Sequence, residues 1–96
     1  MSKGYWMVSV TITDPATYSR YIEANAVAFA KYGARFLARG GRHESPEGPT
    51  GTRNAIIEFE SYAQALACYN SPEYQAALQH RLAASVAHTV IVEGVE

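Results

Sequence analysis

Two arginines are the first candidates for chemistry, because each stands where a guanidinium group needs a negatively charged partner. Arg39 ends a short predicted strand directly before Gly40-Gly41, and Arg81 falls on the apolar stripe of a predicted helix. A guanidinium group binds a carboxylate or a phosphate through two parallel hydrogen bonds. For Arg39 the alternative is an ion pair with Glu58 on the neighbouring strand, which the sequence slightly favours. For Arg81 a carboxylate of the protein and a carboxylate of a ligand fit equally well.

A second group of polar side chains gathers at the start of the last predicted helix, in Tyr69-Asn70-Ser71-Pro72. Here a phenol, an amide and a hydroxyl meet at a helix N-terminus, which favours anions. The structural alternative is that Ser71 caps the helix, Pro72 fills its first position and Tyr69 packs in the core. The strong preference for serine at N-caps favours this second interpretation.

The remaining reactive side chains give no recognisable motif. His43, His80 and His88 share no metal-ligand spacing, so we expect solvated histidines and no metal. Cys68 has no basic neighbour in the sequence and is expected to pack as a small hydrophobe. No nucleophile motif, phosphate-binding loop or nucleotide fingerprint occurs, and we expect no cofactor.

The bulk properties exclude several classes of protein. The 96 residues predict one domain over residues 1–96. A net charge of -1 offers no basic surface for nucleic acid or anionic lipid. No apolar run approaches the roughly 20 residues of a membrane helix. Because the N-terminus leads straight into a predicted strand, we expect no signal peptide. The single cysteine excludes an intrachain disulfide and fits a reducing compartment. Together these properties predict a cytoplasmic protein that binds neither nucleic acid nor membranes.

Alternating and helical patterns predict the elements that position these side chains. Residues 5–13 alternate as a strand, and Asp14-Pro15 then begins a helix that Gly33 ends. Ser61 opens a second helix through a capping box, and this helix is interrupted at residues 70–72 before it restarts. Three further strands and a long glycine- and proline-rich loop complete the chain, the strands at residues 34–39, 53–60 and 89–93 and the loop at residues 40–52.

The order strand–helix–strand–strand–helix–strand predicts an α+β ferredoxin-like fold, with a four-stranded antiparallel sheet and the helices on one face. The helix-covered face is expected to hold Trp6, Val8, Val10, Phe36, Ile57, Phe59, Val90 and Val92. The uncovered face is expected to hold Tyr5, Met7, Ser9, Thr11, Arg35, Leu37, Arg39, Asn54, Ile56, Glu58, Ile91 and Glu93.

The uncovered face combines an apolar patch with a few charged groups. A patch of this size is larger than monomers usually expose. We therefore predict a homodimer in which two sheets pack face to face and leave a partly polar hollow between them.

Several stretches together resemble the DUF1330 family over nearly the whole chain. They are Lys3-Gly4-Tyr5-Trp6, residues 10–15, residues 32–41, residues 69–75, Arg81 and Val92-Glu93-Gly94-Val95. The resemblance implies the dimeric α+β barrel superfamily, which includes monooxygenases and isomerases, while the family itself is functionally uncharacterised. This chain departs from the family pattern at Ala34, where many relatives have glycine, and at Cys68, where an aromatic residue is frequent.

Two classes of function fit these observations. In the first, the protein binds or transforms a small organic acid or aromatic in a cavity between the sheet and the helices, with the candidate ligand-binding residues Arg39, Glu58, Tyr69, Asn70, Ser71 and Arg81. Arg39 and Arg81 would hold the acid, and Tyr69 would donate a hydrogen bond or a proton. In the second, the protein is a non-catalytic dimer whose charged groups fix only the dimer register. The sequence leaves open whether the protein is an enzyme.

Overall fold

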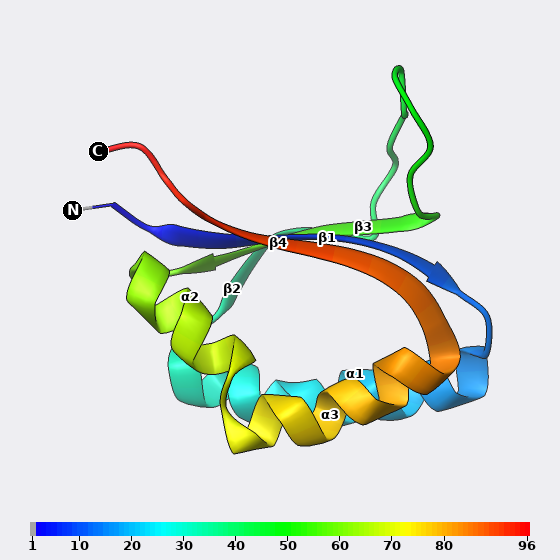
Figure 1. Cartoon of the computed structure of the whole chain (residues 1–96), viewed down its shortest axis with the longest axis horizontal. Coiled ribbons are helices and arrows are strands. Elements are labelled where there is room, and N and C mark those ends of the chain that lie inside the picture. Colours follow the sequence, from blue (N-terminus) through cyan, green and yellow to red (C-terminus); the bar gives the residue numbers. More distant parts are fainter. Residues whose placement is uncertain (1) are drawn as a thin grey trace.

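A computed structural model describes residues 2–96 of the chain (Figure 1). Its elements follow the predicted order, with the second helix divided in two. They are β1 (Gly4–Ile12), α1 (Pro15–Tyr32), β2 (Arg35–Arg39), β3 (Arg53–Phe59), α2 (Tyr62–Tyr69), α3 (Pro72–Ala84) and β4 (Ser85–Glu93).

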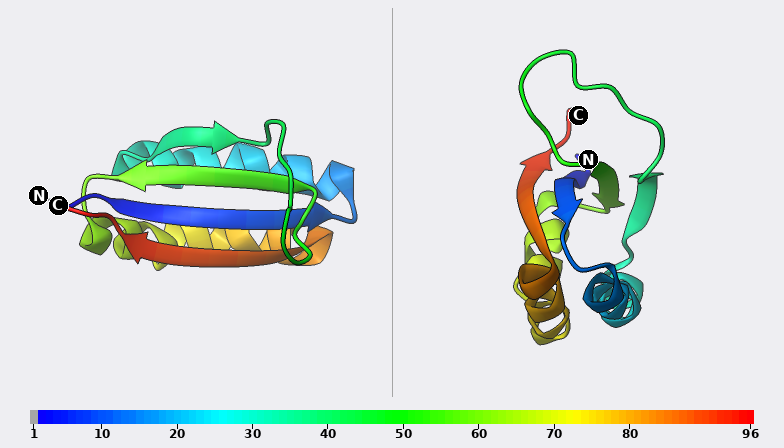
Figure 2. Two further views of the ribbon diagram at one scale, coloured as in Figure 1. Left: turned by 90° about the horizontal axis from the view of Figure 1, so that it is seen from above. Right: turned by 90° about the vertical axis from the view of Figure 1, so that its right-hand side faces the viewer.

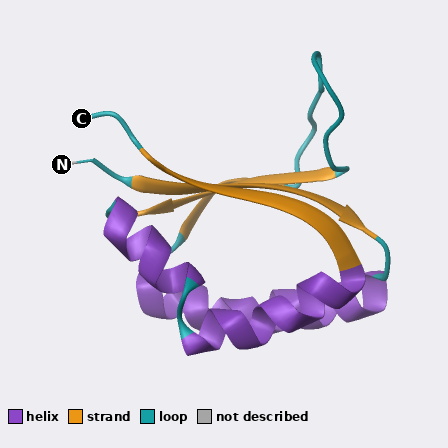
Figure 3. Ribbon diagram, in the orientation of Figure 1, coloured by secondary structure: helices purple, strands orange, loops and turns teal. Residues whose placement is uncertain are grey.

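The strands form one antiparallel sheet in the order β2-β3-β1-β4. All the helices lie on the same side of this sheet (Figure 3), with α1 behind β2 and β3 and α3 behind β1 and β4 (Figure 2). The α+β ferredoxin-like architecture predicted from the sequence is therefore confirmed. We call the sheet surface that faces the helices the covered face and the opposite surface the open face.

The predicted helix ends are also confirmed. The Asp14 side chain accepts a hydrogen bond from the backbone N–H of Thr17, and Gly33 ends α1 in the left-handed conformation, with a φ of 69°. Ser71 accepts a hydrogen bond from the N–H of Tyr74 at 3.1 Å. Ser71 and the proline that follows it thus separate α2 from α3 and begin α3, as the capping preferences predict.

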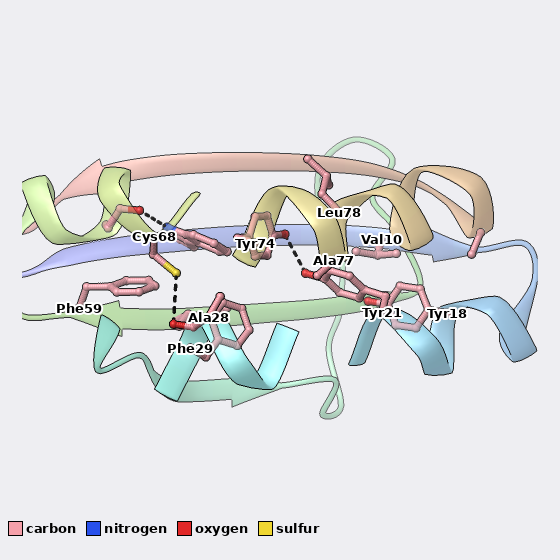
Figure 4. Packing of buried hydrophobic residues seen from close by; sticks show 14 residues of the cluster. Val10, Tyr18, Tyr21, Ala28, Phe29, Phe59, Cys68, Tyr74, Ala77 and Leu78 are labelled. Carbon is pink, nitrogen blue, oxygen red and sulfur yellow. Dashed lines mark hydrogen bonds between the residues drawn. The ribbon is translucent and has the colours of Figure 1, made fainter. Parts of the chain in front are cut away.

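Trp6 is the centre of the core. It is 0% exposed, and its indole N–H donates a hydrogen bond to the backbone oxygen of Ala65 in α2 at 3.0 Å. Its ring centroid lies 5.4 Å from that of Phe29, 5.2 Å from that of Phe59 and 4.9 Å from that of Tyr74. Figure 4 shows Phe29 from α1, Tyr74 from α3 and Phe59 from the sheet within this core. Such edge-to-face contacts add to the gain from burying large apolar surfaces.

The faces predicted for the last strand are wrong by one residue. β4 begins at Ser85, directly after α3, and pairs with β1 so that Ile91 lies opposite Trp6. Ile91 must then share the covered face with Trp6, because directly paired residues point to the same side. A one-residue shift moves every side chain to the other face. The covered side of β4 carries Ala87, Thr89, Ile91 and Glu93, and the open side carries Val86, His88, Val90 and Val92.

A β-bulge corrects the faces predicted for β2. Phe36 lies opposite Ile57, but the pairing then shifts, so that Ala38 lies opposite Ile56 and Arg39 opposite Ala55. The extra residue reverses the alternation after Phe36. Arg39 therefore belongs to the covered face, and its predicted position on the uncovered face is wrong.

The predicted loop at residues 40–52 connects β2 and β3 and stands over the open face, away from the helices (Figure 1). Its base is fixed to β1: the Ser9 and Thr50 hydroxyls lie 2.6 Å apart, and the N–H of Gly51 donates to the Ser9 hydroxyl at 2.7 Å. A Cβ atom at Gly51 would lie 2.5 Å from the backbone N and O of Val10. Only a residue without a side chain fits at this crossing.

This close approach gives a test of the fold. Gly51→Ala should lower the free energy of unfolding by about 1–3 kcal/mol, because the backbone of β1 cannot move aside without strain. Gly41→Ala is the matched control, since nothing lies within 4 Å of its would-be Cβ and its φ is not positive. Urea unfolding followed by Trp6 fluorescence measures both. Equal midpoints for the two variants would contradict the crossing.

Candidate functional site

Arg81 is a buried cation in the interior between α1 and α3. The spacing of Tyr74, Leu78 and Arg81 places all three on the buried side of α3, and Arg81 is only 5% exposed. Its guanidinium carbon lies 5.7 Å from the centroid of the Tyr21 ring, and its Nε has no hydrogen-bond partner. Across residues 2–96 the ion pairs found are Lys3–Glu60 and Lys31–Glu73, so no carboxylate neutralises this charge.

A buried charge without a counter-charge is costly, since it loses its hydration. Burial lowers the pKa of Arg81, but the neighbouring Tyr74 and Tyr21 outweigh this effect and leave the pKa raised. An arginine is in any case protonated at physiological pH. The interior therefore holds a permanent positive charge that is compensated only by phenol groups.

Three tyrosines surround this charge. The hydroxyl oxygens of Tyr21 and Tyr74 lie 2.8 Å apart, and the Tyr18 and Tyr21 ring centroids lie 5.3 Å apart. Figure 4 shows Tyr21 and Tyr74 pointing toward each other from α1 and α3. Burial raises the pKa of Tyr74 and of Tyr18. Both phenols stay protonated at neutral pH and can donate hydrogen bonds to an anion.

A small cavity opens beside these tyrosines, between α1 and the covered face. Its volume is about 30 Å³, and Tyr18, Tyr21 and Asn25 from α1 line one wall. Asn25 is 5% exposed, and no hydrogen bond of its amide is found within residues 2–96. A cavity of this volume holds a water molecule. Arg81 and Tyr74 do not line the cavity themselves but lie next to Tyr21, which does. We call Tyr18, Tyr21, Asn25, Tyr74 and Arg81 the interior site.

Two further arginines stand where the cavity reaches the surface. Arg39 and Arg53 both line it, and the Arg39 guanidinium carbon lies 4.2 Å from the centroid of the Phe36 ring. Arg53 lies against Gly40, where an added Cβ would be 2.5 Å from its Nη1. We call Arg39 and Arg53 the mouth of the cavity.

Two of the six predicted site residues fall at these positions, Arg81 in the interior site and Arg39 at the mouth. Tyr69 lies nearby, with its ring centroid 5.3 Å from that of Tyr74 and 5.7 Å from that of Trp6. Glu58 lies on the open face, where it accepts a hydrogen bond from the Tyr5 hydroxyl at 3.2 Å. Arg39 and Glu58 are thus on opposite faces, and the residue across from Glu58 is Arg35.

Asn70 and Ser71 serve the backbone in this structure. The Asn70 amide donates to the oxygen of Leu66 at 3.1 Å on the exposed side of α2. The Ser71 hydroxyl donates to the oxygen of Cys68 at 2.7 Å while it caps α3, and Ser71 is buried. The structure gives both side chains a structural partner, in agreement with the second interpretation of this stretch.

Sequence reasoning missed Asn25, Arg53 and the role of the tyrosines around Arg81. A signal for Asn25 was present, because it stands four residues after Tyr21 and four before Phe29 on the apolar stripe of α1. An amide on such a stripe needs a partner inside the protein. No comparable signal marked Arg53, whose position depends on the loop.

Cys68 is confirmed as a buried, packed residue. It is 0% exposed, and its sulfur lies 3.9 Å from the backbone oxygen of Ala28 (Figure 4). Burial, with a smaller contribution from Glu73, raises the pKa of the thiol to about 12. The thiolate that would act as a nucleophile is therefore scarce at neutral pH.

The described part of the chain holds neither a metal centre nor a membrane-spanning helix. Between residues 2 and 96, no three side chains of His, Cys, Asp or Glu lie together in a way that could hold a metal ion. No helix in the same range has the length and apolar character to cross a bilayer.

The chain belongs to the DUF1330 family, a domain of unknown function whose model matches residues 3–95. It is similar in structure to RPA0582 of Rhodopseudomonas palustris, a protein of unknown function, with a TM-score of 0.79 and 17% identity over 99% of this chain and 84% of that one. No curated protein matches the sequence.

Two other solved structures share the fold. SnoaB of Streptomyces nogalater, a cofactor-independent oxygenase, gives a TM-score of 0.65 at 11% identity over 100% of this chain and 96% of that one. A dimeric protein of unknown function with a ferredoxin-like fold from Bacteroides fragilis gives a TM-score of 0.61 at 17% identity over 95% of each chain. At these identities the likeness shows the fold alone.

The uncompensated charge gives a stability prediction. Arg81→Met should leave the free energy of unfolding unchanged or raise it by up to about 3 kcal/mol, because an apolar side chain replaces a charge that has no counter-charge. Arg20→Met, at an exposed position of α1, is the control and should change it by less than about 0.5 kcal/mol. Urea unfolding measures both. A loss of more than about 2 kcal/mol in Arg81→Met would show that this arginine holds the fold together.

The raised pKa of Cys68 gives a second prediction. At pH 8 only about one thiol in ten thousand is ionised if the pKa is about 12. Iodoacetamide should therefore alkylate the folded protein far more slowly than the protein in urea, as mass spectrometry would show. Equal rates in the two conditions would mean that Cys68 is accessible and ionised.

Proposed function

We propose that this DUF1330 protein is a homodimer in which each protomer binds a small organic acid in the interior between the sheet and the helices. The observation that carries the proposal is Arg81, a buried arginine that no carboxylate of the described chain neutralises. A protein gains nothing in stability from such a group, so its partner is expected to come from outside the chain.

A ligand carboxylate would satisfy the groups that the interior leaves unpaired. Arg81 would supply the counter-charge, and within the hydrogen-bonded pair of Tyr21 and Tyr74 the hydroxyl that accepts from the other would donate its own hydrogen to the carboxylate. Asn25 adds an amide donor and acceptor at the cavity wall. Charge-assisted hydrogen bonds of this kind contribute about 1.5–3 kcal/mol each.

The rest of the cavity suits the carbon skeleton of the acid. Phe29 and Phe36 line it with Ile57, and the Phe29 and Phe36 ring centroids lie 5.6 Å apart. A few polar groups at one end of an apolar hollow is the usual composition of a small-molecule site. This lining would suit the carbon skeleton of an aliphatic or an aromatic acid once the cavity of about 30 Å³ has widened to admit it.

Binding rather than turnover is the function that these side chains support. None of the described residues that line the cavity is a histidine, aspartate or glutamate. The buried phenols have raised pKa values and can act as donors but not as bases at neutral pH. SnoaB is an oxygenase without a cofactor, so the same fold accommodates chemistry in another protein, and product analysis in the binding experiment below would reveal turnover here.

The open face supports the dimer. Five apolar side chains are exposed on it, namely Met7, Ile56, Val86, Val90 and Val92. A hollow of about 360 Å³ lies over part of this surface. Monomers rarely expose so large an apolar patch, and a similar structure from Bacteroides fragilis is dimeric. A second copy packed sheet to sheet would cover the patch.

Calorimetric titration tests the acid site. Hexanoate and benzoate are the probes, and we expect saturable binding by the wild type and at least about tenfold weaker binding by Arg81→Gln, which keeps a polar side chain but removes the charge. Arg20→Gln, on the exposed side of α1, should bind like the wild type. If neither acid binds the wild type, the protein is better described as a non-catalytic dimer whose arginines have only structural roles.

Sedimentation velocity tests the dimer separately. Val90→Glu places a charge at a 56% exposed position of the open face and should convert the dimer to a monomer. Leu82→Glu introduces the same charge at a 61% exposed position of α3, away from that face, and should leave the dimer intact. A monomeric wild type, or dissociation by both variants, would argue against sheet-to-sheet packing.

A further inference from the structure

The mouth of the cavity carries two positive charges in addition to Arg81, which alone would neutralise one bound carboxylate. Arg39 and Arg53 line the same opening, and neither takes part in an ion pair found in residues 2–96. The whole chain has a net charge of -1. The pair is therefore a local concentration of positive charge and does not reflect a generally basic protein.

Arg39 reaches the mouth only because of the β-bulge in β2. Without the extra residue after Phe36, the alternation of the strand would put Arg39 on the open face. With it, the guanidinium group lies over the Phe36 ring, 4.2 Å from the centroid. A bulge that directs one side chain into a cavity is a common feature of binding sites.

Arg53 is placed by the chain that follows β2. It is the first residue of β3 and lies opposite Val10, so its side chain is on the covered face. Gly40 has a φ of 69° and leaves room for the guanidinium group where a Cβ would lie 2.5 Å from Nη1. The Arg53 side chain also lies beside the Tyr18 hydroxyl, whose pKa it lowers against the larger effect of burial. The mouth and the interior site are thus in contact through Tyr18.

Two like charges at one opening repel each other and are stabilised by an anion between them. We infer that the ligand is a small dicarboxylic acid: one carboxylate is bound by Arg81 and the phenols, and the second by Arg39 and Arg53 at the mouth. This inference rests on the proposed acid site and adds its substrate class. Guanidinium groups favour carboxylates because the two groups match in geometry.

The cavity must widen to admit such a molecule. At about 30 Å³ it holds a water but no dicarboxylate. The groups that close it toward solvent are the exposed Arg39 and the half-buried Arg53. Both are long, flexible side chains that can swing outward without moving the backbone. Binding would then replace their contacts with Phe36 and Gly40 by contacts with the second carboxylate.

The test compares acids of equal carbon number by calorimetric titration at low salt. Adipate, with two carboxylates, should bind the wild type at least about tenfold more tightly than hexanoate, with one. Arg39→Gln and Arg53→Gln should each bring the ratio of the two affinities close to one, because each removes a charge that would bind the second carboxylate. Arg20→Gln, on the exposed side of α1, should keep the wild-type ratio.

Three other results would contradict the dicarboxylate inference. Equal affinity of the wild type for adipate and hexanoate would overturn the dicarboxylate inference and leave the acid site standing. A preference for adipate that survives in the Arg39→Gln/Arg53→Gln double variant would also overturn it, because another group would then bind the second carboxylate. Failure of both acids to bind the wild type would reject the acid site and this inference with it.

Discussion

Arg81 places a full positive charge in the interior, and this charge limits which side chains can pack around it. Because it is 5% exposed, has no carboxylate partner in residues 2–96 and leaves its Nε without a hydrogen bond, its surroundings must supply polar groups that point inward. Tyr21 from α1 and Tyr74 from α3 do so, and their mutual hydrogen bond at 2.8 Å ties the two helices together at the level of the charge. Edge-on packing of Tyr74 against Trp6 continues this contact into the sheet. The polar interior and the apolar core are therefore one packed structure, in which the tyrosines take part in both.

The two faces of the sheet have different compositions because they meet different surroundings. The covered face combines large aromatic side chains with the arginines of the mouth, whereas the open face carries valines, a methionine and an isoleucine without a partner in the same chain. The β-bulge in β2 contributes to this difference, because it places Arg39 on the covered face, at the cavity, instead of on the open face. A charge that would oppose the proposed sheet-to-sheet packing is thereby moved to the cavity, where it would be available to a bound anion.

Local rules predicted most of the fold from the sequence. Asp14, Gly33 and Ser71 mark helix ends through short-range chemistry, so the elements and their order were correct. The faces of β2 and β4 were not predictable in this way. Their alternation depends on a bulge and on pairing with a distant strand, and a run such as Thr89-Val90-Ile91-Val92 is apolar on both sides. Arg81 was identified because an arginine on an apolar stripe is unusual, while Arg53 became meaningful only beside Gly40 in space.

A chain of 96 residues has little surplus stability, which makes an unpaired buried charge informative. Methionine or leucine at position 81 would fill similar space without the cost of desolvating a guanidinium group. The arginine thus lowers stability unless something compensates it, and its phenol neighbours provide only part of that compensation. Under the proposed function, binding energy from an anion would supply the remainder. Such a trade between stability and binding is typical of functional sites, and under the proposed function it would link the stability of this protein to the concentration of the acid.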